Sequence, residues 1–124
     1  MHVGSTGINL GLETWKLYCL EHGIFSDGYL ADAQLTKKNN SENDYTQKFF
    51  SENRNGKQVP RAGFIDLDRE AIDNVRYGEY RHLFENSQLF AGKEDSGNNF
   101  ARGYITLGEE QVDLCNDQIR KLVE

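Results

Sequence analysis

Three polar, glycine-containing segments constrain the fold most, because each has the character of a turn that leaves a strand and enters a helix. They are residues 4–11 (Gly-Ser-Thr-Gly-Ile-Asn-Leu-Gly), residues 59–68 (Val-Pro-Arg-Ala-Gly-Phe-Ile-Asp-Leu-Asp) and residues 92–103 (Gly-Lys-Glu-Asp-Ser-Gly-Asn-Asn-Phe-Ala-Arg-Gly). In open α/β sheets such turns gather at the carboxyl ends of the strands, where ligands bind. The pattern predicts an α/β fold in which helices flank a parallel sheet.

The pattern of apolar residues assigns the remaining elements. We expect strands at residues 1–3, 62–67 and 87–90, and helices at about residues 11–21, 68–77, 99–101 and 107–123. Ile8, Leu12, Trp15 and Cys19 recur at helical spacing and should form a buried face, and Gly23 is suited to end that helix.

Two further segments carry specific expectations. Residues 26–58 are polar and read as one long surface loop, with a helical turn near residues 45–50. In the last helix, an apolar stripe should face the core; it consists of Val112, Cys115, Ile119 and Leu122. No composition shift marks a domain boundary, so we treat residues 1–124 as one domain.

Charge and composition exclude several functional classes. The formal net charge of −6 argues against a general surface for nucleic acid or anionic membrane. No apolar run is long enough to predict a membrane-spanning helix. Cys19 and Cys115 are far apart in sequence and favour two buried thiols over a disulfide, which fits a reducing compartment.

The first turn, residues 4–11, spaces its glycines as G-x-x-G-x-x-x-G. This is neither the dinucleotide fingerprint nor a Walker loop, so a simple tight turn is one interpretation. The other is a phosphate site, because backbone amides at a helix N-terminus attract anions. In that case Ser5, Thr6 and Asn9 could add hydrogen bonds.

The second turn places two carboxylates, Asp66 and Asp68, at the end of a strand. Side chains two positions apart on a strand share a face, so both carboxylates could point the same way. Such a pair fits a Mg²⁺ ion held between protein and phosphate oxygens. The alternative is that one aspartate caps the following helix.

The third turn contains the polar sequence Asp95-Ser96-Gly97-Asn98-Asn99 in front of a helix. The amides of Ser96 and Gly97 could hold phosphate, and Asn98 could reach phosphate or sugar. An ordinary turn with an Asx cap explains the same residues.

Taken in order, the three turns resemble the first three nucleotide-binding loops of the tubulin family. The likeness covers nearly the whole chain except residues 26–48, and it is carried by Trp15–Ile24, Val59–Asp68, Gly92–Gly103 and Ile119–Leu122. The segments Leu17–Leu20 and Gly92–Asp95 are more similar to the alpha chains than to the beta chains of that family.

This resemblance implies a Rossmann-like GTPase domain, shared with bacterial FtsZ, that binds GTP with Mg²⁺ at an interface between subunits. It implies a structural constituent of microtubules in the cytoplasmic cytoskeleton, partnered by beta-tubulin and neighbouring tubulin subunits. By position, residues near phosphate, base or ribose would be Ser5, Thr6, Asn9, Asp95, Ser96, Gly97 and Asn98. Asp66 and Asp68 would face the magnesium and phosphate region, with Asp68 as the metal contact.

Four positions depart from the family pattern. Ser5 and Asn9 stand where the family has glutamine, and Arg69 stands where it has proline. Asp68 stands where alpha chains have glutamate, which keeps the charge but shortens the reach by about one methylene. A direct metal contact could therefore be lost or become a water-mediated one.

The resemblance also implies an N-terminal part only, truncated at both ends, without the family's glycine-rich phosphate loop. We therefore expect no GTP hydrolysis by the chain alone. Two alternatives remain: a non-catalytic remnant, or a GTP-independent module that binds tubulin or its chaperones. Lys37 or Lys38 would correspond to the lysine that is acetylated in alpha chains.

Overall fold

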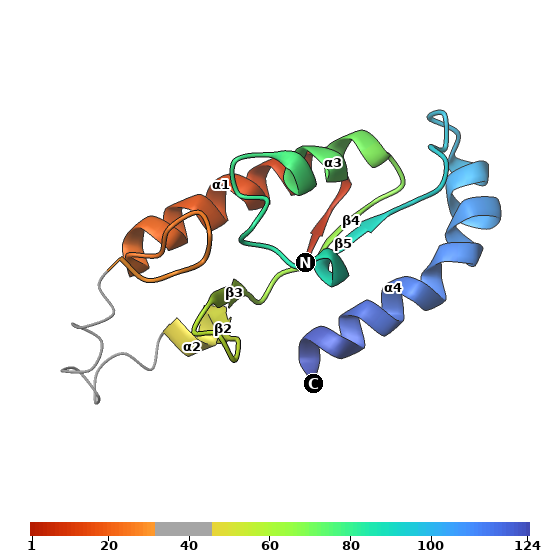
Figure 1. The fold of residues 1–124 in the computed structure, drawn as a ribbon. Helices are drawn as coiled ribbons and strands as arrows, with labels where there is room; N and C mark the ends of the chain where they lie inside the picture. The colour runs from red at the N-terminus through yellow and green to blue at the C-terminus, as the bar shows by residue number, and fades with distance from the viewer. Residues whose placement is uncertain (32–45) are drawn as a thin grey trace.

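The computed structural model describes residues 1–31 and 46–124 (Figure 1). Its strands are β1 His2–Val3, β2 Phe50–Glu52, β3 Gln58–Pro60, β4 Phe64–Asp66 and β5 Leu89–Ala91. Its α-helices are α1 Gly4–His22, α2 Thr46–Phe49, α3 Arg69–Tyr77 and α4 Leu107–Val123. Asn86–Gln88 forms a 3₁₀ turn, and Arg102–Thr106 forms a π-helical segment directly before α4.

The predicted parallel sheet is present, with the strand order β1-β4-β5. Val3 pairs with Ile65 and Asp66 pairs with Ala91, both in parallel register. β4 is therefore the central strand, as expected for a buried apolar run. Because all three strands are parallel, their carboxyl ends meet at one edge of the sheet.

Helices lie on both sides of this sheet, which confirms the expected fold class (Figure 1). α1 and α3 contact each other and both pack on β4. Phe64 of β4 belongs to the core that these helices cover. A Cβ atom added at the neighbouring Gly63 would point to the opposite face, toward α4, and would lie 2.9 Å from Leu122 Cδ1.

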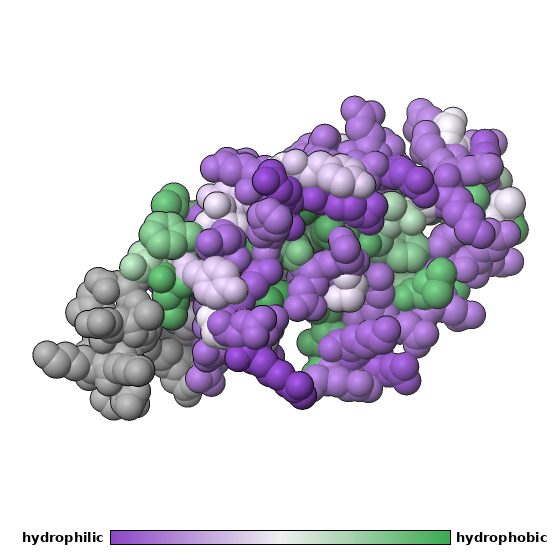
Figure 2. Space-filling model, in the orientation of Figure 1, coloured by the Kyte–Doolittle hydropathy of each residue, from purple (hydrophilic) through white to green (hydrophobic). Residues whose placement is uncertain are grey.

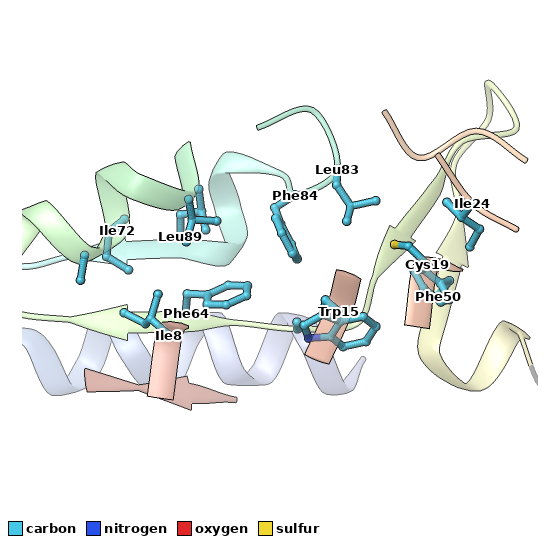
Figure 3. Packing of buried hydrophobic residues seen from close by; sticks show 13 residues of the cluster. Ile8, Trp15, Cys19, Ile24, Phe50, Phe64, Ile72, Leu83, Phe84 and Leu89 are labelled. Atoms are coloured by element: carbon cyan, nitrogen blue, oxygen red, sulfur yellow. The ribbon is translucent and has the colours of Figure 1, made fainter. Parts of the chain in front are cut away.

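The core runs from the sheet to the β2–β3 hairpin (Figure 3). Ile8, Phe64 and Ile72 are fully buried at one end of it, and Cys19 and Phe50 are buried at the other. Aromatic rings fill the middle, where Phe64 meets Phe84 edge to face and Trp15 meets Phe50 in the same way; the ring-centroid distances are 4.9 and 5.4 Å.

The prediction of a turn at residues 4–11 was wrong, because these residues belong to helix α1. Residues 4–11 form the first two turns of the helix itself, because the chain reverses at Gly4 alone, with φ at +77°. The buried face of α1 contains the expected Ile8, Trp15 and Cys19, with Leu12 partly buried beside them. The helix ends as predicted at Gly23, which is left-handed.

The segment predicted as one long loop, residues 26–58, includes strand β2 and the first residue of its partner β3. β2 and β3 are antiparallel, with Ser51 opposite Val59. The expected helical turn near residues 45–50 is confirmed as α2. The two candidate lysines, Lys37 and Lys38, lie outside the described residues.

β5 begins two residues later than expected. Residues 86–88 are held in a 3₁₀ turn by reciprocal hydrogen bonds between Glu85 and Gln88, so the extended backbone starts only at Leu89. The expected short helix at residues 99–101 is continuous with the π-helical segment.

Helix α4 has the predicted bounds, but only part of its predicted apolar stripe is covered, namely Cys115 and Leu122, which are half-buried. Val112 and Ile119 are 49% and 39% exposed, whereas Leu107 and Gln111 are buried. The covered face of α4 therefore contains Leu107, Gln111, Cys115 and Leu122, and leaves Val112 and Ile119 outside it. Hydrophilic residues cover much of the face seen in Figure 2, with apolar groups between them.

None of the helices in residues 1–31 and 46–124 has the length and apolarity needed to cross a membrane. The two cysteines are free thiols, as predicted, but only Cys19 is buried and Cys115 is half-buried. Burial raises the pKa of Cys19 to about 11 and also raises the pKa of Cys115.

Candidate functional site

The polar residues of the three segments lie at the carboxyl ends of β1, β4 and β5, which the sheet brings to one edge. Residues 59–68 contain β4 itself, so the second turn is residues 66–68. The second and third turns are also bonded directly, because the amide of Gly92 donates to the carbonyl oxygen of Asp66 at 2.8 Å. Gly92 lies so close to Leu67 that an added Cβ would be 2.8 Å from the Leu67 Cα. The absence of a side chain at residue 92 therefore allows these two turns to touch.

The first turn presents a helix N-terminus. α1 has no side-chain cap at Val3 and no acidic residue in its first turn. Its first amides are thus without intrahelical acceptors, and they combine with the helix dipole to favour an anion. Ser5, Thr6 and Asn9 are all exposed there, and Ser5 and Asn9 are four residues apart on one helix face.

A half-buried histidine, His2, packs against this end of α1. The indole nitrogen Nε1 of Trp15 donates to Nε2 of His2 at 3.1 Å, and the His2 ring stacks on Phe64 at 4.9 Å. Gly11 makes room for this ring, since a Cβ at residue 11 would collide with it. Burial, and secondarily the positive amino terminus, lowers the pKa of His2, which favours the neutral ring that accepts the Trp15 proton.

The second turn places its two aspartates differently from the strand expectation. β4 ends at Asp66, so the alternation of a strand does not extend to Asp68. Asp66 Oδ1 accepts the amide proton of Asp68 at 3.0 Å, and Asp68 Oδ1 accepts that of Glu70 at 2.9 Å. Asp68 is therefore the N-cap of α3, which was the alternative interpretation, and neither of these two bonds uses Oδ2.

The carboxylates of Asp66 and Asp68 fit a magnesium site only together with a phosphate ligand. No group of three or more His, Cys, Asp or Glu side chains in the described part of the chain could hold a metal ion. Mg²⁺ typically takes one or two carboxylates, several waters and substrate phosphates. Asp66 and Asp68 supply that number of carboxylates beside a helix N-terminus suited to phosphate. A bound Mg²⁺ would neutralise phosphate charge there.

The third turn has an unusual backbone. Gly97 and Asn98 are both left-handed, with φ of +59° and +58°. The left-handed conformation of Asn98 costs free energy that glycine would not lose, although asparagine tolerates positive φ better than most residues. Asp95, Gly97 and Asn98 are exposed and Ser96 is half-buried. The turn ends at an Asx cap, where Asn99 Oδ1 accepts the amide proton of Arg102 at 3.3 Å.

An ion pair closes the third turn, and sequence reasoning missed it. Arg102 Nη2 lies 2.6 Å from Glu94 Oε2, so the two ends of the turn are held together. The opposite charges eight residues apart were the available signal. The pair is largely exposed and contributes at most about 1 kcal/mol, so it orders the turn more than it stabilises the fold.

The candidate site residues thus lie on three adjacent turns. The arrangement offers backbone amides and hydroxyls from α1, carboxylates after β4, and small polar groups after β5. A separate pocket of about 470 Å³ lies elsewhere, between the hairpin, the 3₁₀ turn and the end of α4; Arg54, Glu85 and Lys121 are among its lining residues. The carboxyl edge of the sheet suits an anionic ligand better than this pocket does, because the N-terminus of α1 presents backbone amides there.

Comparison with protein families agrees with this geometry. The model of the tubulin/FtsZ family, GTPase domain, matches residues 1–124. A parallel sheet with polar turns at its carboxyl edge is the arrangement in which α/β proteins bind nucleotides. The chain therefore belongs to the tubulin/FtsZ family and carries sequence of its GTPase domain.

Proposed function

We propose that this chain is an alpha-tubulin-type subunit of the microtubule cytoskeleton that binds GTP with Mg²⁺ at an interface between subunits. A cytoskeletal GTP-binding role is common to its family, whose members polymerise with other subunits. The alpha type, the metal and beta-tubulin as the partner are the finer parts of the proposal, as is a cytoplasmic location on microtubules. They are supported by the alpha-like segments Leu17–Leu20 and Gly92–Asp95.

One observation carries the nucleotide site: three polar turns follow adjacent parallel strands and two of them are bonded through Gly92 and Asp66. A triphosphate has several charged oxygens, so it needs donors from more than one element. The N-terminus of α1 supplies backbone amides, and the turn after β5 supplies small polar groups beside it.

We assign the following roles within this proposal. Phosphate contacts come from the first turn of α1, with Ser5, Thr6 and Asn9 as side-chain donors. Asp66 and Asp68 face Mg²⁺ through their second carboxylate oxygens, with Asp68 as the metal contact. Contacts to phosphate and ribose come from residues of the third turn: Asp95, Ser96, Gly97 and Asn98.

The shorter side chains make water part of this site. Ser5 and Asp68 each reach less far than the family's glutamine and glutamate, so water completes the gap to phosphate or metal. Water-mediated contacts retain much of the enthalpy of direct hydrogen bonds. We therefore expect binding to persist with a weaker dependence on Mg²⁺ than a direct carboxylate contact would give.

The test is calorimetric titration of the purified chain with GTP, with and without Mg²⁺, alongside circular dichroism. Saturable binding that tightens with Mg²⁺ supports the proposal. As a matched control, Glu70→Gln removes an exposed carboxylate from the first turn of α3, two residues from Asp68, and should leave the Mg²⁺ dependence unchanged.

The other outcomes separate the alternatives. A folded chain that binds no GTP but co-purifies with tubulin would indicate a GTP-independent binding module. A chain that binds neither GTP nor tubulin would indicate a remnant that has kept the motifs without the function.

A further inference from the structure

The tip of the β2–β3 hairpin carries chemistry that the nucleotide site does not use. The turn consists of Asn53, Arg54, Asn55 and Gly56, and it connects the two strands shown in Figure 1. Gly56 is left-handed, with φ at +77°, which a side chain would strain. A turn followed by such a glycine is a common way to close a hairpin. The fold thus places a glycine directly after an exposed asparagine.

We propose that Asn55 is a site of spontaneous deamidation, controlled by opening of this hairpin. In this reaction the backbone nitrogen of Gly56 attacks Cγ of Asn55, the Cγ–Nδ2 bond breaks and ammonia leaves. A five-membered succinimide ring remains. Water then opens the ring at one of its two carbonyl carbons, giving either aspartate or isoaspartate, so solvent water is the only co-reactant.

The structure explains why Asn55 should react before its neighbour Asn53. Gly56 carries no side chain that could block the attack, and an added Cβ there would meet only Glu52 Oε1, at 3.9 Å. Asn53 is followed by Arg54, whose long side chain crowds the same approach. The two asparagines lie two residues apart in one turn, so each serves as a comparison for the other.

The folded hairpin also restrains the reaction. The attacking amide of Gly56 donates to the Asn53 carbonyl oxygen at 2.9 Å, and the Asn55 amide donates to Asn53 Oδ1 at 3.0 Å. Asn53 also donates from its amide to the Lys57 carbonyl oxygen at 2.9 Å. The Gly56 nitrogen must leave its acceptor before it can reach Cγ, so reaction requires local opening.

Deamidation would change the surface at a defined place. It adds one negative charge beside Arg54, which lines the separate pocket together with Glu85 and Lys121. The isoaspartate product also lengthens the backbone by one carbon, which disrupts the register between Asn53 and Lys57. The modification therefore marks chains whose hairpin has opened and changes the charge at the pocket rim.

The experiment follows the mass difference between amide and acid during incubation at neutral pH, in the folded chain and in urea. Cleavage after glutamate, performed at mildly acidic pH, yields residues 53–70, in which Asn53 and Asn55 are the only asparagines. We expect Asn55 to deamidate first, and at least tenfold more slowly when folded. A tenfold difference corresponds to an opening free energy of about 1.4 kcal/mol.

Two variants keep the test decisive. Asn53→Ala removes the acceptor of the Asn55 amide and should speed deamidation of the folded chain by about threefold or more, since a typical hydrogen bond is lost. Asn55→Gln should be silent, because its longer side chain would require a less favourable six-membered ring. Equal rates at Asn53 and Asn55 in urea would overturn the site, and equal folded and unfolded rates at Asn55 would overturn control by the hairpin.

Discussion

Asp68 has two proposed roles that can be separated by substitution. It caps α3 by accepting the Glu70 amide proton at 2.9 Å, and it is proposed to face Mg²⁺. Asp68→Ala removes both roles, whereas Asp68→Asn keeps a side-chain oxygen that caps nearly as well and removes the charge. The two variants should therefore differ in stability but not in metal dependence.

The expected stability changes follow from the capping bond. Loss of an N-cap costs about 0.5–2 kcal/mol, so Asp68→Ala should lower the free energy of unfolding by about 1 kcal/mol. For a chain of this length that corresponds to about 4 °C in Tm. Asp68→Asn loses only the attraction between its carboxylate and the helix dipole, about 0.3–1 kcal/mol at an exposed position.

Urea unfolding measures the first effect, and calorimetric titration with GTP at several Mg²⁺ concentrations measures the second. Both variants should lose the same part of the Mg²⁺-dependent affinity. If Asp68→Asn retained the full dependence on Mg²⁺, the assignment of Asp68 to the metal would be wrong. If Asp68→Ala were as stable as the parent chain, the capping argument would fail as well.

Three further predictions concern the supports of the site. The pKa of His2 is lowered from its ordinary value of 6.5, so the unfolded chain binds a proton first, and unfolding free energy should fall as pH drops below 6.5. Urea titrations should lose part of this slope in His2→Gln, and an unchanged slope in that variant would contradict the role of the Trp15 bond. Gly92→Ala should cost about 1–3 kcal/mol in urea unfolding, because its Cβ would press on the Leu67 backbone, and a neutral result would refute the tight contact. Asn98→Gly should relieve the strain of a left-handed residue and leave stability equal or higher while weakening GTP binding in calorimetry; unchanged affinity would remove Asn98 from the site.

The part of the fold that was predictable from sequence is the part determined by local patterns. The apolar run at residues 62–67 contains β4, and the helix expected at residues 68–77 is α3, with Asp68 as its N-cap. Parallel topology then placed the polar turns at one edge. These predictions needed only alternation, capping residues and glycine positions.

The hairpin escaped prediction because its strands lack an alternating pattern. In β2 only Phe50 is buried, and the two residues after it are exposed and polar. β3 contributes Gln58, Val59 and Pro60, all buried, including a polar residue and a residue that cannot donate to a ladder. Pairing between such short strands depends on the surrounding core, which a local window does not contain.

The polar segments of the candidate site could be identified from the sequence, but the bonds between them could not. The contact of Gly92 with Leu67 and Asp66 is made by backbone atoms, which leave little trace in side-chain chemistry. The stripe on α4 was only partly right for a related reason: helical periodicity identifies an apolar face, but neighbouring elements decide which of its residues are covered.

The length of α1 has a mechanical consequence. Its 19 residues form a rod of about 28 Å, which begins at the proposed phosphate contacts and ends at Gly23, next to the Ile24–Leu30 bridge. Because an α-helix is stiff along its axis, α1 would move as one unit. A tilt of only about 5° at the phosphate end would displace the far end by about 2 Å. A ligand that tilted α1 at the proposed phosphate contacts would therefore also move the residues around Gly23 at its far end.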